Sequence, residues 1–99
     1  MKIITQSLHF TADQKLLAYI EQKFSSLENY FQQIIQADVF LKLENTGQIK
    51  EKTVEVRLKV PGDTIFISEK NLKFEAAVDA VNEKLKRSVI KYKQQLRSR

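Results

Sequence analysis

Residues 53–68 read TVEVRLKVPGDTIFIS, and this stretch decides the fold class of the chain. Apolar and charged residues alternate strictly over residues 54–60, which is typical of a strand with one buried face and one wet face. Pro61-Gly62-Asp63 then predicts a tight turn, because Pro presets φ and Gly allows a positive φ. Residues 64–68 alternate again, so the stretch predicts two antiparallel strands whose apolar face must be covered.

Two more strands are expected upstream of this stretch. Residues 2–8 are rich in Ile and Thr, and residues 37–44 alternate between apolar and polar or charged side chains. Asn45-Thr46-Gly47 is expected to break the second of these strands and to begin a short connection to the strand at 54–60. The sequence therefore predicts four strands in all.

Apolar residues recur at helical spacing in two segments. The first covers residues 12–30, and Thr11 with Gln14 resembles a capping box at its start. The second begins after Asn71, which is expected to cap it. Its apolar stripe keeps a period of about 3.6 residues over more than six turns. The stripe consists of Phe74, Val78, Val81, Leu85, Val89, Tyr92 and Leu96.

The order of elements is strand, helix, three strands, helix, without a Gly/Ser-rich linker or an internal repeat. We therefore expect one domain over residues 1–99, of the α+β class. The predicted architecture is a two-layer β-α-β-β-β-α sandwich, with a mixed four-stranded sheet and both helices on one face. The first strand–helix–strand unit should cross over right-handedly, which makes its two strands parallel if they pair.

The composition of the 99-residue chain excludes several classes of protein. It has no Cys, which excludes a disulfide framework, a thiol nucleophile and a Cys-ligated zinc site. No apolar run approaches the roughly 20 residues that a membrane span needs, and the N-terminus lacks the apolar segment of a signal peptide. We expect a small cytoplasmic protein.

The net charge of +5 is concentrated in the last fifth of the chain. Residues 81–99 contain seven Lys and Arg against one Glu, whereas residues 1–80 contain ten basic and eleven acidic residues. A basic block on a nearly neutral body indicates a polyanionic partner, either nucleic acid or an anionic membrane surface. The membrane is the weaker of the two, since the sheet already needs the apolar face of the helix. The structural alternative is a solvated helix face that happens to be positive.

The basic residues of the second helix are expected on both sides of its apolar stripe. At about 100° per residue, they divide into Lys84, Arg87 and Lys91 on one flank and Lys86, Lys93 and Arg97 on the other. Such a ridge would fit a groove lined with phosphates. Arg97 and Arg99 also complement the negative end of the helix dipole.

Residues that could support catalysis are few. The single imidazole, His9, falls at the end of the first strand, where a surface position is expected. Asp79 and Glu83 lie one helical turn apart, and we expect them to be solvated or paired with neighbours such as Lys86 and Arg87. The chain has no nucleophile–base set, metal-ligand pair or phosphate-binding loop. We therefore expect no enzyme, no metal and no cofactor.

Three aromatic residues could stack on nucleic-acid bases: Tyr19, Tyr30 and Phe40. Tyr19 and Tyr30 are equally suited to flank the core. Phe40 alternates with Val39 and Leu41, so it is expected on the open side of the sheet, where it could contact a ligand.

Two motifs resemble those of a known family. Residues 23–31, KFSSLENYF, resemble the K-x-x-x-L-E-x-Y-F end of the first helix in the ribosome hibernation promoting factor family, which includes the ribosome-associated inhibitor and is also called sigma modulation protein. Residues 76–93 contain AAVD, KLKR and KYK and resemble the family's A-A-[IV]-D-x-x-x-x-K-L-x-R-Q-x-x-K-x-K helix. The resemblance covers essentially the whole chain. It implies a fold similar to double-stranded RNA-binding domains, and binding to the small ribosomal subunit in the path of messenger and transfer RNA, which keeps idle ribosomes inactive.

The resemblance also implies which residues contact ribosomal RNA. The predicted rRNA-binding residues are Lys23, Lys84, Lys86, Arg87, Lys91 and Lys93. All of them except Lys86, an additional charge, match basic positions of the family. Ser88 stands where Gln is usual and Glu75 where an aromatic residue is common, and these departures bear on individual contacts.

Two other functions fit the residues as well. One is a general double-stranded RNA-binding protein, and the other is a regulator whose basic helix binds an acidic protein partner. Long members of the resembled family add a C-terminal domain that pairs two ribosomes. Because the chain stops about one turn after Leu96, we expect a monomer that acts on single ribosomes and leaves pairing to a separate protein.

Overall fold

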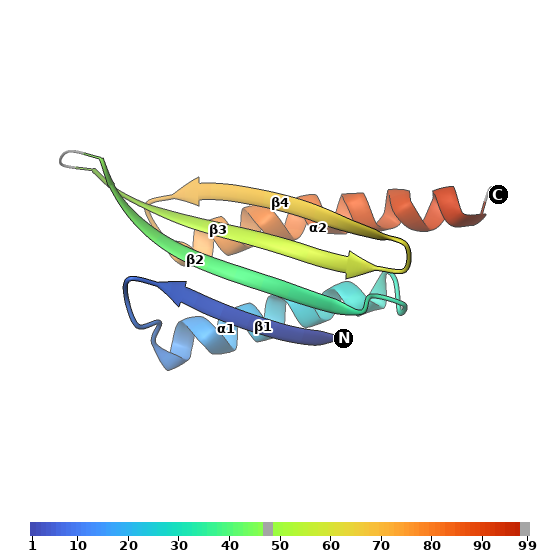
Figure 1. Ribbon diagram of the computed structural model, residues 1–99, viewed down its shortest axis with the longest axis horizontal. Coiled ribbons are helices and arrows are strands. Elements are labelled where there is room, and N and C mark those ends of the chain that lie inside the picture. Colours follow the sequence, from blue (N-terminus) through green and yellow to red (C-terminus); the bar gives the residue numbers. More distant parts are fainter. Residues whose placement is uncertain (47–48, 98–99) are drawn as a thin grey trace.

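The computed structural model describes residues 1–46 and 49–97, and its elements follow the predicted order (Figure 1). Gly47 and Arg99 lie outside the described residues. The elements are β1 (Lys2–Leu8), α1 (Gln14–Ser25), the 3-10 helix η1 (Ser26–Asn29), β2 (Gln36–Thr46), β3 (Ile49–Val60), β4 (Asp63–Asn71) and α2 (Phe74–Arg97). None of the helices in the described residues combines the length and the hydropathy needed to cross a membrane.

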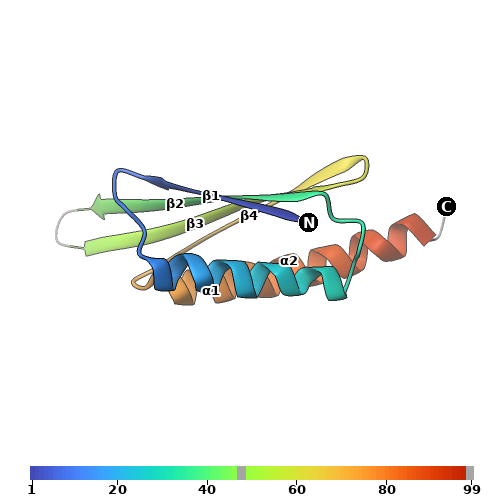
Figure 2. The same cartoon turned by 90° about the horizontal axis from the view of Figure 1, so that it is seen from below.

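The four strands form one mixed sheet in the order β1-β2-β3-β4. β1 pairs with β2 in parallel, and β3 pairs antiparallel with both β2 and β4. Val56 in β3 lies opposite Val39 in β2 and Ile67 in β4, so the apolar positions of the strands align in one row. Seen along its edge, the sheet has both helices on the same side and nothing on the other (Figure 2). The predicted α+β sandwich is thereby confirmed.

The core lies between the sheet and the two helices, as the alternation of the strands predicts. The fully buried strand residues are Ala37, Val39, Leu41, Val54, Val56 and Leu58, and the fully buried helical residues are Ile20, Phe24, Leu27, Ala77, Val78, Val81, Leu85 and Val89. Every second residue of β2 and β3 points to the helices, and every third or fourth residue of α2 points back to the strands. Tyr19 and Tyr30 are half-buried and pack against this core, so they flank it.

The first helix begins and ends differently from the prediction. Its cap is Asp13, whose Oδ1 accepts a hydrogen bond of 2.8 Å from the Leu16 amide, so Thr11 does not form the predicted capping box. The helix cannot start earlier, because its first backbone bond runs from the Leu17 amide to the Asp13 carbonyl at 3.1 Å. At the other end, residues 26–29 tighten into a 3-10 turn before the chain leaves for β2.

The connections on either side of β3 and β4 also differ in detail. β2 continues through Asn45 and Thr46, so these residues extend the strand instead of breaking it. Asn71 ends β4, and its Oδ1 accepts from the Leu72 amide at 2.7 Å and the Lys73 amide at 3.4 Å. Because the first helical bond of α2 joins Ala77 to the Lys73 carbonyl, Asn71 shapes the turn before the helix and is not its cap.

The turn predicted at residues 61–63 comprises Pro61 and Gly62, since β4 begins at Asp63, and it anchors the second half of α2. Gly62 has a φ of +84°, a conformation that side chains with a Cβ rarely adopt. The Tyr92 hydroxyl of α2 donates a hydrogen bond to the Pro61 carbonyl, and the Tyr92 ring packs edge-on against Phe31 with a centroid distance of 5.9 Å. The turn therefore helps to set the direction in which α2 extends beyond the sheet (Figure 2).

The packing of α2 on the sheet predicts the effect of truncating one core residue. Leu85 is fully buried, so we expect Leu85→Ala to lower the free energy of unfolding by about 2–5 kcal/mol through lost apolar burial and the cavity left behind. Ile90 lies on the same helix with 37% of its surface exposed, and Ile90→Ala should cost less than about 1 kcal/mol. Urea unfolding followed by circular dichroism measures both; equal losses would contradict the assigned packing.

Candidate nucleic-acid interface

Burial of its apolar stripe leaves α2 with two accessible flanks. One flank adjoins β4, because Lys84 forms an ion pair with Glu69 of β4, and Lys91 borders a hollow of about 250 Å³ together with Asp63 and Ile65. The other flank adjoins α1 and η1. The basic side chains of the helix therefore divide around the buried stripe as the helical period predicts.

The flank beside β4 carries Lys84, Arg87 and Lys91, all three exposed. The Lys84 side chain is 54% exposed, and the ion pair with Glu69 compensates much of its charge. Arg87 and Lys91 form no ion pair among the described residues. This flank thus offers two uncompensated cations, separated by about one helical turn.

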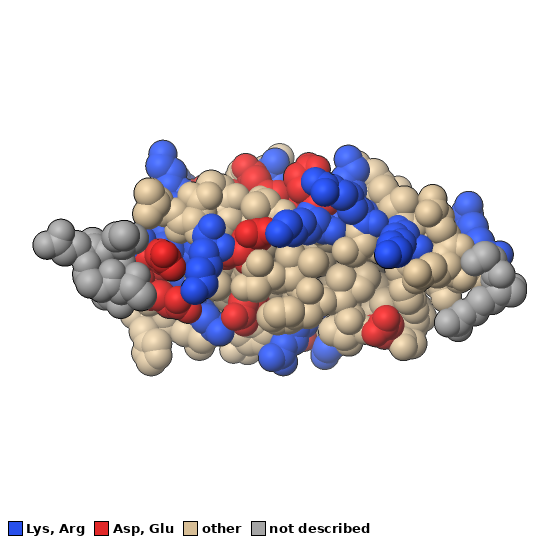
Figure 3. Space-filling view, turned by 90° about the horizontal axis from the view of Figure 1, so that it is seen from above, with Lys and Arg blue, Asp and Glu red and all other residues tan. Residues whose placement is uncertain are grey.

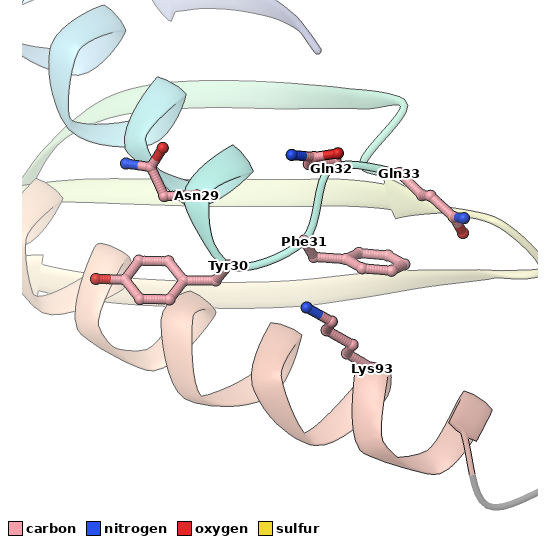
Figure 4. Close-up of a pocket in the computed structure, with 6 residues that line it drawn as sticks. All are labelled: Asn29, Tyr30, Phe31, Gln32, Gln33 and Lys93. Atoms are coloured by element: carbon pink, nitrogen blue, oxygen red, sulfur yellow. The ribbon is translucent and has the colours of Figure 1, made fainter.

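The flank beside α1 carries Lys86 and Lys93, both half-buried. The Lys86 ammonium lies 4.9 Å from the centre of the Tyr30 ring, a cation–π contact that leaves the charge in place. Lys93 borders an open pocket of about 240 Å³ lined by residues 29–33, and Figure 4 shows its ammonium pointing from α2 toward the segment of Tyr30 and Phe31. Neither lysine has an acidic partner in the part of the chain that the structure describes.

Lys23, the candidate on α1, forms an ion pair with a residue of α2, and 39% of its side chain is exposed. Its ammonium lies 3.5 Å from Asp79 of α2 and 5.5 Å from the centre of the Tyr19 ring. The Tyr19 hydroxyl donates a hydrogen bond to the same carboxylate, and this bond, with burial and the nearby charges of Asp79 and Glu75, raises the pKa of Tyr19 to about 12. Lys23, Tyr19 and Asp79 thus join the two helices.

This contact corrects the expectation for Asp79. The prediction had it solvated or paired with neighbours such as Lys86 and Arg87 on its own helix. The Asp79 side chain is 49% exposed, and its partners are Tyr19 and Lys23 on α1. The reason is tertiary: α1 packs beside α2 and brings a hydroxyl and an ammonium to the position of Asp79. The Asp79 carboxylate therefore links the two helices.

His9 is exposed directly after β1, with a positive φ of 69°, as expected for a residue at the end of a strand. No cluster of three or more His, Asp or Glu in residues 1–46 and 49–97 could hold a metal ion.

The surface around α2 is mainly basic toward the C-terminus (Figure 3). Figure 3 shows Lys and Arg side chains along the part of this face nearer the C-terminus, with few acidic side chains among them.

Two residues on the open face of the sheet were not predicted as candidates from the sequence. Phe66 in β4 is 53% exposed, and Arg57 in β3 lies over the Phe40 ring with its guanidinium carbon 5.4 Å from the ring centre. Phe40 lies on the open face as predicted, half-buried. Because Ile65 and Ile67 were predicted on the buried side of their strand, the same alternation predicts Phe66 on the open face with Phe40.

Comparison with known proteins places the chain among proteins of the ribosome. Residues 3–97 match the family model described as "Sigma 54 modulation protein / S30EA ribosomal protein". The ribosome hibernation promoting factor of Pseudomonas putida is 29% identical over 98 residues, which cover 99% of this chain and 92% of that protein. The ribosome hibernation promotion factor of Staphylococcus aureus is 35% identical over 75 residues, which cover 76% of this chain and 39% of that longer protein.

Two solved structures have the same fold. The ribosomal subunit interface protein of Coxiella burnetii superposes with a TM-score of 0.83 at 21% identity, covering 95% of this chain and 99% of that chain. The N-terminal domain of Protein Y from Thermus thermophilus superposes with a TM-score of 0.75 at 24% identity, covering 92% of this chain and 94% of that chain. The family match over residues 3–97 shows that the chain belongs to the Sigma 54 modulation protein / S30EA ribosomal protein family.

Proposed function

We propose that this protein is a ribosome hibernation factor, which binds the small ribosomal subunit in the path of messenger and transfer RNA and keeps idle ribosomes inactive. Its family and the names of its relatives support this function. The observation that carries it is the set of uncompensated cations on both flanks of α2. These are Lys86, Arg87, Lys91, Lys93 and Arg97.

The proposed mechanism is steric and involves no catalysis. Phosphate contacts position a protein on folded RNA without reading its sequence, which suits a target defined by its shape. α2 has 24 residues and so extends for roughly 36 Å, long enough to present cations to both walls of a groove. Held there, the domain would occupy the space that messenger and transfer RNA need. The protein would act in the cytoplasm, where ribosomes are.

The two alternative functions predict different binding partners. A general double-stranded RNA-binding protein would bind any duplex about as well as ribosomes, whereas a hibernation factor would strongly prefer intact ribosomes. A regulator of an acidic protein would keep its partner after nuclease treatment of a lysate. Sedimentation of a stationary-phase lysate, with and without nuclease, therefore separates the three. Protein that remains at the top of the untreated gradient would contradict the proposed function.

Salt should weaken ribosome binding in proportion to the phosphates neutralised. With five uncompensated cations on α2, we expect log affinity to fall against log salt with a slope of about −3.5, using the single-strand coefficient. Fluorescence anisotropy of labelled protein with purified small subunits, from low to high potassium chloride, measures this slope. A slope near zero would show that phosphate contacts do not carry the binding.

Charge reversal should separate the cations of α2 from cations elsewhere. Arg87→Glu with Lys91→Glu removes two of the five uncompensated cations, so we expect much weaker ribosome binding and a shallower salt slope of about −2. The matched control is Lys15→Glu with Lys50→Glu, two exposed lysines in the first turn of α1 and at the start of β3. Both element starts lie at the end of the molecule away from the C-terminal end of α2 (Figure 1). Equal losses in both double variants would indicate a diffuse charge effect and contradict the assigned interface.

We also propose that the protein is a monomer in solution and acts on single ribosomes, so that any pairing of ribosomes needs a second protein. The edge strand β4 carries Glu69 and Lys70, both in ion pairs, and charges on an edge strand oppose strand-to-strand pairing. Light scattering should give a mass near 11.6 kDa. A ribosome-dimer peak on a sucrose gradient, formed from purified ribosomes and this protein alone, would be the contrary result.

A further inference from the structure

We propose that the open face of the sheet binds unpaired RNA nucleotides by stacking their bases on Phe40, Arg57 and Phe66. This inference rests on the proposed function, because it adds a second RNA contact to a protein that already sits on the ribosome. The face lies on the side of the sheet opposite the helices (Figure 2). It is therefore separate from the cations of α2.

Three planar groups cross this face from β2 to β4. Arg57 lies directly opposite Phe66 in the register of β3 and β4, and its guanidinium carbon is 5.4 Å from the centre of the Phe40 ring. Because neighbouring strands are about 4.8 Å apart, the three groups form a short row. Phe66 keeps 53% of its surface exposed, so at least one ring presents area to a ligand. Aromatic rings and Arg planes are the surfaces on which proteins stack unpaired bases.

The charges around this row favour a polyanion. Asp38 lies opposite Arg57 in the register of β2 and β3. Its carboxylate, however, forms an ion pair with Lys59 at 3.4 Å and accepts a hydrogen bond of 2.6 Å from the side-chain amide of Gln36. Glu55 likewise pairs with Lys42 at 2.9 Å. Arg57 therefore has no carboxylate partner among the described residues. The acids closest to the row are compensated, and a free guanidinium remains at its centre.

The same pattern disfavours a protein partner. Charged residues separate the exposed apolar ones on this face, since Asp38 and Arg57 lie between Ile4 and Phe66 in one cross-strand row. The cores of protein interfaces are depleted of charged residues, and no uninterrupted apolar patch forms here. Base stacking needs only separate planar groups in polar surroundings, which this face supplies.

The test uses the full chain and a fluorescein-labelled RNA of ten nucleotides without secondary structure. We expect Phe66→Ala to weaken binding about tenfold, the typical loss for one stacked base, and Phe66→Tyr to retain it. Phe66→Leu keeps an apolar side chain but loses the ring, so it should behave like Phe66→Ala. The control is Leu72→Ala, which removes an apolar side chain that is 66% exposed just beyond β4. Thermal melts establish that each variant is folded.

Amide chemical shifts identify the surface that the RNA contacts. We expect shifts at Phe40, Arg57, Phe66 and their strand neighbours when the RNA is added to ¹⁵N-labelled protein. Shifts confined to α2, or equal affinity of Phe66→Ala and the unchanged protein, would overturn the inference. Self-association that disappears in Phe66→Ala would also overturn it, because the face would then pair two copies of the chain.

Ribosome binding separates this inference from the proposed function. If the function fails, neither the unchanged protein nor Phe66→Ala sediments with ribosomes, while the oligonucleotide experiment still reports on the face. If only the inference fails, Phe66→Ala binds ribosomes as the unchanged protein does. Because the proposed binding site leaves no room for messenger RNA, ribosomal RNA is the expected source of the unpaired bases. Weaker binding of Phe66→Ala to purified small subunits free of messenger RNA would support this source, and unchanged binding would contradict it.

Discussion

The burial of one apolar stripe of α2 against the sheet is the contact on which the rest of the structure depends. Val78, Val81, Leu85 and Val89 are fully buried in it, and burying side chains of this size stabilises a fold by about 1.5–3 kcal/mol each. Because this stripe faces the strands, the rotation of the helix about its axis is set. The same rotation places the basic residues on two flanks, so the packing that stabilises the domain also displays its charge.

The protein uses part of its positive charge internally. Lys23 is held by Asp79, and Lys84 by Glu69, so two of six basic candidates join elements of the fold. Lys86 lies against the Tyr30 ring and keeps its charge. The basic residues of α2 without an acidic partner among the described residues lie along its second half, from Lys86 to Arg97. Only the end of the helix beyond Tyr92, which contacts Pro61, extends past the turn between β3 and β4 (Figure 1). Structure and binding therefore draw on the same residue types at different positions.

The two layers of the domain present different chemistry. The helical side offers cations suited to phosphates, and the open side of the sheet offers Phe40, Arg57 and Phe66 among compensated charges. A β-α-β-β-β-α sandwich leaves this second side uncovered, because both helices return to the same face. Leaving one face of an antiparallel hairpin wet is ordinary. Its exposed Phe66 is what distinguishes it from a plain polar face.

The sequence by itself determined the elements, their order, the face each strand buries and the two flanks of α2, because the periods of two and 3.6 residues are local properties. It did not determine the partners of charged groups. The residue that caps α1 is Asp13 and not Thr11, because the helix begins at Gln14. Asp79 of α2 forms its contacts with Tyr19 and Lys23 of α1. Which cations stay free was decided by the tertiary structure, since an ion pair depends on residues distant in sequence coming within about 4 Å.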